Sequence, residues 1–60
     1  MFVVGAPPKD SQDYVGTVYI DGIEFSDIVK WNKRAQMYKG YSGNLYKDKD
    51  IIAWDDPSQD

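Results

Sequence analysis

Basic and aromatic side chains are interleaved through residues 30–49, a combination suited to binding a polyanion. This segment holds six lysines and arginines against one carboxylate, a net charge of +5, whereas the other forty residues hold one lysine against nine carboxylates, a net charge of −8. The total charge of −3 hides this separation. Proteins that hold single strands combine a positive groove for the phosphates with aromatic rings on which bases stack. We therefore predict a nucleic-acid-binding surface, with a single strand as the favoured ligand, made by Lys30, Lys33, Arg34, Tyr38, Lys39 and Tyr41.

The six residues are expected to contribute in different ways. Lys33 and Arg34 lie furthest from any apolar run, so we expect both to be exposed. Tyr38 and Tyr41 are the rings that we expect to stack on bases, while Trp31 is assigned to the core. A solvated surface without a ligand is the main alternative, because lysines on a hairpin also protect sheet edges from aggregation. A host protein is the other alternative partner.

Catalytic chemistry is restricted by the absence of both Cys and His. This excludes disulfides, thiolate nucleophiles, zinc sites of the Cys/His type and His-based triads. The carboxylate pair Asp55-Asp56 can in principle hold Mg²⁺ with substrate phosphates, but paired acids on exposed segments usually serve only as solvated charge. The sequence also lacks a P-loop and a G-x-G-x-x-G motif. We predict no enzymatic activity, no cofactor and no metal.

The clearest structural element is a β-hairpin centred on Asp21-Gly22. Runs rich in β-branched and aromatic residues flank this dipeptide, and Asp-Gly is typical of the type I′ turn, in which both central residues have positive φ. A two-residue turn pairs Ile20 with Ile23, Val18 with Phe25, Tyr14 with Val29 and Gly16 with Asp27. The last pair places a carboxylate on the apolar side, so we expect a bulge near residues 26–27.

Residues 26–39 allow two interpretations. Ser26 can cap a helix that Gly40 ends, with apolar residues at helical spacing between them. Alternatively, Ile28–Trp31 extends the preceding strand and a loop follows. We further expect a strand over residues 41–46, a turn over 47–50 and a closing strand over 51–54. Phe2–Val4 is expected to form a short edge strand or a frayed end.

The predicted fold is a mostly β antiparallel meander of four to five strands, either an SH3-like half-barrel or an open sheet that dimerises. One small domain is expected over residues 1–54, with a Pro-rich loop over 5–13 and an acidic, disordered tail over 55–60. A 60-residue chain without disulfides has a small core, so homo-oligomerisation is a further possibility. No stretch is apolar enough to span a membrane, and the lack of cysteine is consistent with a cytoplasmic protein.

Three sequence patterns give the chain a family resemblance. They are DYxGxVxIDGxEF over residues 13–25, Trp31-x-Lys33, and YSGxL over residues 41–45. Together they resemble small, mostly uncharacterised phage and mobile-element proteins over about residues 13–47. The resemblance implies a β domain that acts in the bacterial cytoplasm, on DNA or on a host protein. The alternative function that we consider is a phage-type inhibitor or anti-defence adaptor in host takeover, which binds a host protein either through an acidic surface that mimics nucleic acid or by adding a strand to a partner sheet.

Overall fold

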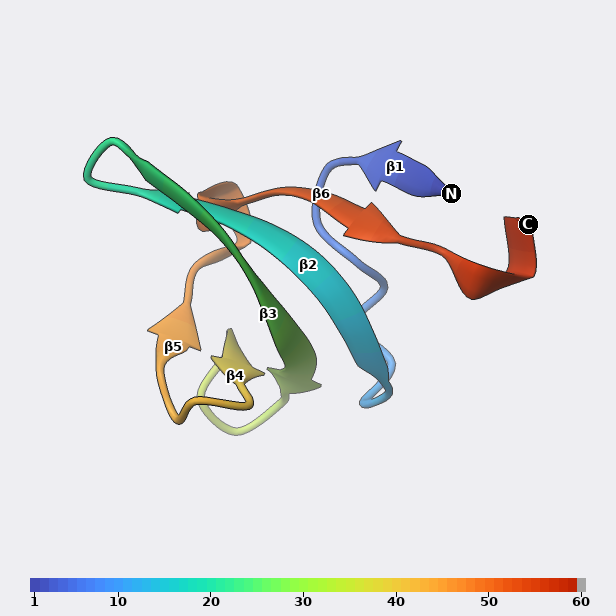
Figure 1. Ribbon diagram of the computed structural model, residues 1–60. Helices are drawn as coiled ribbons and strands as arrows, with labels where there is room; N and C mark the ends of the chain where they lie inside the picture. Colours follow the sequence, from blue (N-terminus) through green and yellow to red (C-terminus); the bar gives the residue numbers. More distant parts are fainter. Residues whose placement is uncertain (60) are drawn as a thin grey trace.

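Six antiparallel strands form a single open sheet in the computed structural model, which describes residues 1–59 (Figure 1). The spatial order of the strands is β1-β6-β2-β3-β4-β5, so that β1 and β5 are the two edges. The strands are β1 (Phe2–Val4), β2 (Asp13–Ile20), β3 (Ile23–Asn32), β4 (Met37–Gly40), β5 (Leu45–Tyr46) and β6 (Ile51–Asp55). Two single turns of 3₁₀ helix, η1 (Asp48–Asp50) and η2 (Pro57–Gln59), flank β6. The predicted mostly β, antiparallel fold is therefore confirmed, as an open sheet with six strands where four to five were expected.

The β2–β3 hairpin has the predicted register from end to end. Asp21 and Gly22 both have positive φ, 53° and 78°, as a type I′ turn requires. The expected bulge near residues 26–27 is wrong, because Gly16 lies directly opposite Asp27 in an unbroken ladder. The one irregularity of β2 is in its pairing with β6, between Thr17 and Val18. The Asp27 carboxylate is accommodated on the apolar side because it accepts hydrogen bonds from the hydroxyls of Ser42 and Tyr46.

The second hairpin, β3–β4, decides between the two interpretations of residues 26–39 in favour of strand and loop. β3 extends to Asn32, a four-residue loop follows, and Gln36 takes a positive φ of 55° at its end. The Asn32 side chain accepts a hydrogen bond from the Ala35 amide at 3.0 Å, which stabilises this loop. Residues 26–30 are held in the ladder with β2 and residues 29–32 in the ladder with β4, so these residues do not form a helix.

The core lies on one face of the sheet, which we call the core face. Its fully enclosed side chains come from five different strands: Val18, Val29, Tyr38, Tyr46 and Ile51. Trp31 packs against this cluster as predicted, with its ring 4.9 Å from that of Tyr38. Trp54 meets Tyr14 edge-on at 5.1 Å. Aromatic pairs in these geometries add about 0.5–1.5 kcal/mol each beyond the area that they bury.

The loop between β1 and β2 closes one side of the core. Pro7 is buried, and its carbonyl accepts a hydrogen bond from the hydroxyl of Tyr38. Lys9 lies over the ring of Trp31 at 4.8 Å and forms an ion pair with Asp48 at 3.3 Å. This loop thus covers the core face with its own side chains and backbone.

Two expectations about the later part of the chain are wrong. The strand predicted over residues 41–46 is limited to β5, because residues 41–44 form a turn in which Gly43 has a φ of 96°. The tail predicted over residues 55–60 begins too early, since Asp55 pairs with both Phe2 and Val15 in the sheet. Residues 57–59 form η2, and Asp60 lies outside the described residues.

Candidate nucleic-acid interface

The second face of the sheet, which we call the open face, carries the candidate site. Strand alternation places Lys30, Lys39 and Ile28 on this face, opposite to the core residues of the same strands. Apolar side chains on it remain exposed to solvent, including Val15 at 42% and Ile28 at 44%. The open face therefore combines positive charge with uncovered apolar surface.

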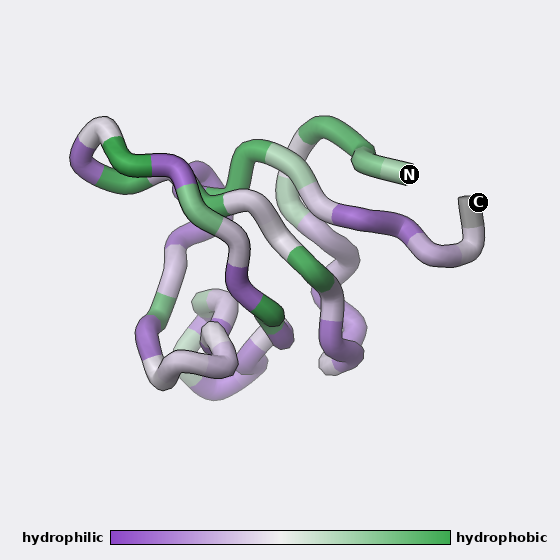
Figure 2. The backbone as a smooth tube through the Cα atoms, in the orientation of Figure 1, coloured by the Kyte–Doolittle hydropathy of each residue, from purple (hydrophilic) through white to green (hydrophobic). Residues whose placement is uncertain are grey.

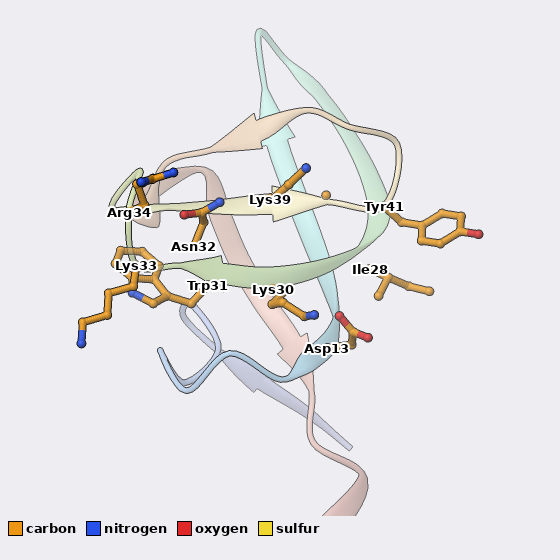
Figure 3. Close-up of a pocket in the computed structure, with 10 residues that line it drawn as sticks. Asp13, Ile28, Lys30, Trp31, Asn32, Lys33, Arg34, Lys39 and Tyr41 are labelled. Atoms are coloured by element: carbon orange, nitrogen blue, oxygen red, sulfur yellow. The ribbon is translucent and has the colours of Figure 1, made fainter.

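A groove of about 550 Å³ runs over β3 and β4 on this face. Five of the six predicted site residues line it: Lys30, Lys33, Arg34, Lys39 and Tyr41. Figure 3 shows Lys33 and Arg34 at one end, Lys30 and Lys39 in the middle, and Tyr41 beside Ile28 at the other end. The groove is thus cationic along most of its length and ends in an aromatic ring.

The four cations of the groove are exposed, and none has an ion-pair partner within residues 1–59. Lys30 and Lys39 lie directly opposite each other on β3 and β4. Directly opposite side chains have Cβ atoms about 4.5–5.5 Å apart, and like charges in this position destabilise a sheet. On its other side Lys30 faces Asp13 of β2, the one carboxylate in the lining of the groove. The site therefore has a net positive charge that a bound anion would relieve.

Tyr41 is the exposed aromatic residue of the groove, with 86% of its surface accessible. Its backbone is nevertheless fixed, because its amide donates to the Ile28 carbonyl at 2.7 Å. The turn that follows is tied to β3 by Asp27, whose carboxylate accepts hydrogen bonds from the hydroxyls of Ser42 at 2.9 Å and Tyr46 at 2.6 Å. A fixed backbone beneath a solvent-exposed ring is a suitable platform for stacking.

The pKa of Asp27 reflects the same network. Burial alone raises the pKa of this carboxyl, but hydrogen bonds from Tyr46, Ser42 and the Ile28 amide lower it by more, so that it lies below the ordinary value of 3.8. The ionised form is the one that accepts all of these bonds. Asp27 is therefore a charged anchor of the turn and does not line the groove.

Tyr38 corrects the predicted site. It lies on the core face, with 0% of its surface exposed, and its hydroxyl is bonded to Pro7. Burial, together with the nearby carboxylates of Asp48 and Asp10, raises its pKa above the ordinary value. The physical reason is strand alternation: Tyr38 pairs with Trp31, which faces the core, whereas its neighbour Lys39 faces the groove. Tyr38 cannot stack on a base without unfolding the domain.

Asp13, Ile28, Asn32 and Gly40 line the groove but were missed from the sequence, and Trp31, which was assigned to the core, also contributes to the lining. A signal for Asp13 was present, because the register set by Asp21-Gly22 places it opposite Lys30. The same register places Ile28 beside Val15 on the face away from the core. The sequence did not predict that Asn32 lines the groove, because its position depends on the loop that follows the end of β3.

Comparison with known proteins gives no relatives: no family model, curated protein or solved structure matches the chain. Across residues 1–59, no helix has the length and apolar character that crossing a bilayer requires. Within the same range, no three carboxylates gather closely enough to hold a metal ion.

Proposed function

We propose that the protein is a non-enzymatic module that binds single-stranded nucleic acid in the groove on the open face. The observation that carries this proposal is the exposed pair of Lys30 and Lys39, placed directly opposite each other without an ion-pair partner in the described chain. Such a pair costs stability in the free protein and is relieved by a phosphate between the two ammonium groups. Lys33 and Arg34 extend the positive charge along the groove.

A single strand is favoured over a duplex because of Tyr41. Its ring is available at the end of the groove, and a ring can stack only on a base that is not already paired and stacked within a helix. Stacking on an aromatic ring tolerates any base, so we expect weak sequence preference. The phosphates are expected to supply most of the affinity and to make it depend on salt.

The test is a fluorescence-anisotropy titration with labelled single-stranded DNA and RNA. Lys39→Glu is expected to weaken binding strongly, whereas Lys47→Glu is the matched control: the same charge change within the basic segment, but outside the groove. The log–log slope of affinity against salt should be about −0.7 for each phosphate contacted on a single strand. Absence of binding at low salt, or an equal loss in both variants, contradicts the proposal.

A protein partner is the second candidate, and a different surface favours it. The tip of the β2–β3 hairpin projects from the sheet (Figure 1) and borders an apolar cavity of about 360 Å³. Ile23 is 64% exposed and Leu45 48% exposed at its margin. An apolar recess on a projecting hairpin suits a side chain of a host protein, as in the phage-type inhibitor or anti-defence role. Ile23→Lys should abolish such binding and leave oligonucleotide binding unchanged, and Lys39→Glu should do the reverse.

A further inference from the structure

Within residues 1–59, the outer edge of β1 has backbone hydrogen-bonding groups that no other strand uses. Antiparallel partners alternate between pairs that exchange hydrogen bonds and pairs that do not. The Met1 carbonyl accepts a hydrogen bond from the Asp56 amide, and the Gly5 amide donates one to the Ile52 carbonyl, both at 2.8 Å. The backbone N–H and C=O groups of the odd-numbered residues in this segment therefore point toward β6. Phe2 and Val4 lie between them, and their N–H and C=O groups therefore point away from the sheet. The edge offers two donors and two acceptors in a row.

The same two residues also expose their side chains. Phe2 is 64% exposed and Val4 92% exposed, the latter the most exposed large apolar residue in the described chain. Figure 2 shows β1 as a hydrophobic strand next to the hydrophilic end of β6. Edge strands are normally protected by a charge, a proline or a bulge, and β1 contains none of these. An edge of this kind is suited to pair with another strand.

We propose that the partner is a second copy of the chain, with the two β1 strands paired antiparallel about a two-fold axis at Val3. In this register Phe2 lies opposite Val4 of the partner copy and each pair exchanges two hydrogen bonds, four in total. The result is a continuous sheet of twelve strands, because each copy contributes six. The candidate grooves then lie toward the two far ends of the joined sheet.

Self-complementarity is the reason for choosing a second copy. A two-fold axis at Val3 pairs Phe2 of each copy with Val4 of the other, so every outward N–H and C=O group of these two residues finds a partner. An axis at Phe2 or at Val4 would place the other residue opposite a position outside β1 and leave its backbone groups unpaired. It also places an apolar side chain against an apolar side chain on both faces, and the half-buried Val3 meets its equivalent on the core face. A 60-residue domain that leaves so much apolar surface exposed has a physical reason to pool its core with a copy.

Analytical ultracentrifugation of the full chain tests the proposal. The wild type is expected to sediment at twice its chain mass of 6.9 kDa, and Val4→Lys as a monomer, because a charge on an edge strand opposes pairing. Ile23→Lys is the matched control, since it places the same charge at another exposed apolar position on the hairpin tip and should remain a dimer. Val4→Pro removes the outward N–H without touching the bonds to β6, and it should also be monomeric. Circular dichroism checks that each variant is folded.

Amide hydrogen exchange identifies the interface. In the proposed dimer the Phe2 and Val4 amides are protected, and in Val4→Lys the Phe2 amide exchanges freely while that of Val3 stays protected by β6. The proposal is overturned by a wild-type chain that is monomeric at every concentration tested, or by a dimer that Val4→Lys leaves intact. A dimer lost equally in Val4→Lys and Ile23→Lys also overturns it. None of these results depends on nucleic-acid binding.

Discussion

The two faces of the sheet satisfy their side chains in opposite ways. On the core face, polar groups that are buried have internal partners: Tyr38 bonds to Pro7, and Asp27 bonds to Ser42 and Tyr46. On the open face, the cations of the groove have no ion-pair partner among residues 1–59. The difference shows that the polar groups buried on the core face are satisfied within one chain, whereas the cations on the open face have no ion-pair partner in the part of the chain that the structure describes.

The strongest test of this contrast replaces a tyrosine on the core face. Tyr38→Ala removes a fully buried ring and is expected to cost about 3–5 kcal/mol. A 60-residue domain has a total stability of only about 3–9 kcal/mol at about 0.05–0.15 kcal/mol per residue, so this variant should lose a large part of its stability. Urea denaturation followed by Trp fluorescence measures the change. A loss below 1 kcal/mol would show that the ring is not part of the core.

Gly40 and its neighbour Lys39 allow the two faces to be compared at adjacent residues of β4. A Cβ atom here would clash with the carboxylate of Asp27 and lie 2.6 Å from the ring of Tyr46. Gly40→Ala is therefore expected to destabilise the domain by about 1–3 kcal/mol, as overpacking of a core does. Lys39→Ala, at the neighbouring residue on the open face, is the control and should change stability by less than about 0.5 kcal/mol.

Replacing Tyr41 is expected to affect binding and not stability, the opposite of replacing Tyr38. Because this ring is 86% exposed, Tyr41→Ala should leave the free energy of unfolding within about 0.5 kcal/mol of the wild type. It should weaken oligonucleotide binding by about 1–3 kcal/mol, the contribution of one stacked base. Tyr41→Phe retains a ring and should bind normally. Equal binding by the alanine variant would remove Tyr41 from the site.

Acid should weaken the core face through Asp27. Its pKa in the folded protein lies below the ordinary value of 3.8, so the unfolded chain binds the proton more readily. The contribution of this carboxylate to stability is complete well above 3.8 and is lost as the pH falls through the folded pKa. Thermal unfolding between about pH 6 and about pH 2 should show this loss, and Asp27→Asn should show a smaller pH dependence over the same range. An equal pH dependence in the variant contradicts this role.

The smallest expected effect is that of replacing Asp13, and this change should strengthen oligonucleotide binding, whereas Tyr41→Ala weakens it. This carboxylate faces Lys30 across the strands and repels phosphates in the groove. Asp13→Asn should therefore strengthen oligonucleotide binding slightly, by less than about 1 kcal/mol, the range of exposed charge pairs. Asp10→Asn, outside the groove, is the control. Weaker binding by Asp13→Asn would indicate that Asp13 contacts a base.

The sequence by itself determined the β2–β3 hairpin and the separation of charge. Asp21-Gly22 specifies its own turn, and this local geometry sets the register of every pair back to Asp13 and Lys30. Charge is likewise a property of the chain, so the four groove cations could be named without a structure. Both features depend on residues that are close together along the sequence or on composition alone.

Tertiary structure decided which aromatic residues are available. Tyr38 and Tyr41 look equivalent in sequence, yet the loop before β4 fixes a register in which Tyr38 faces the core. The place of Asp27 depends on hydroxyls that lie 15 and 19 residues further along the chain. These outcomes arise from contacts between distant residues, and the alternation of a strand turns each one-residue shift in register into a change of face.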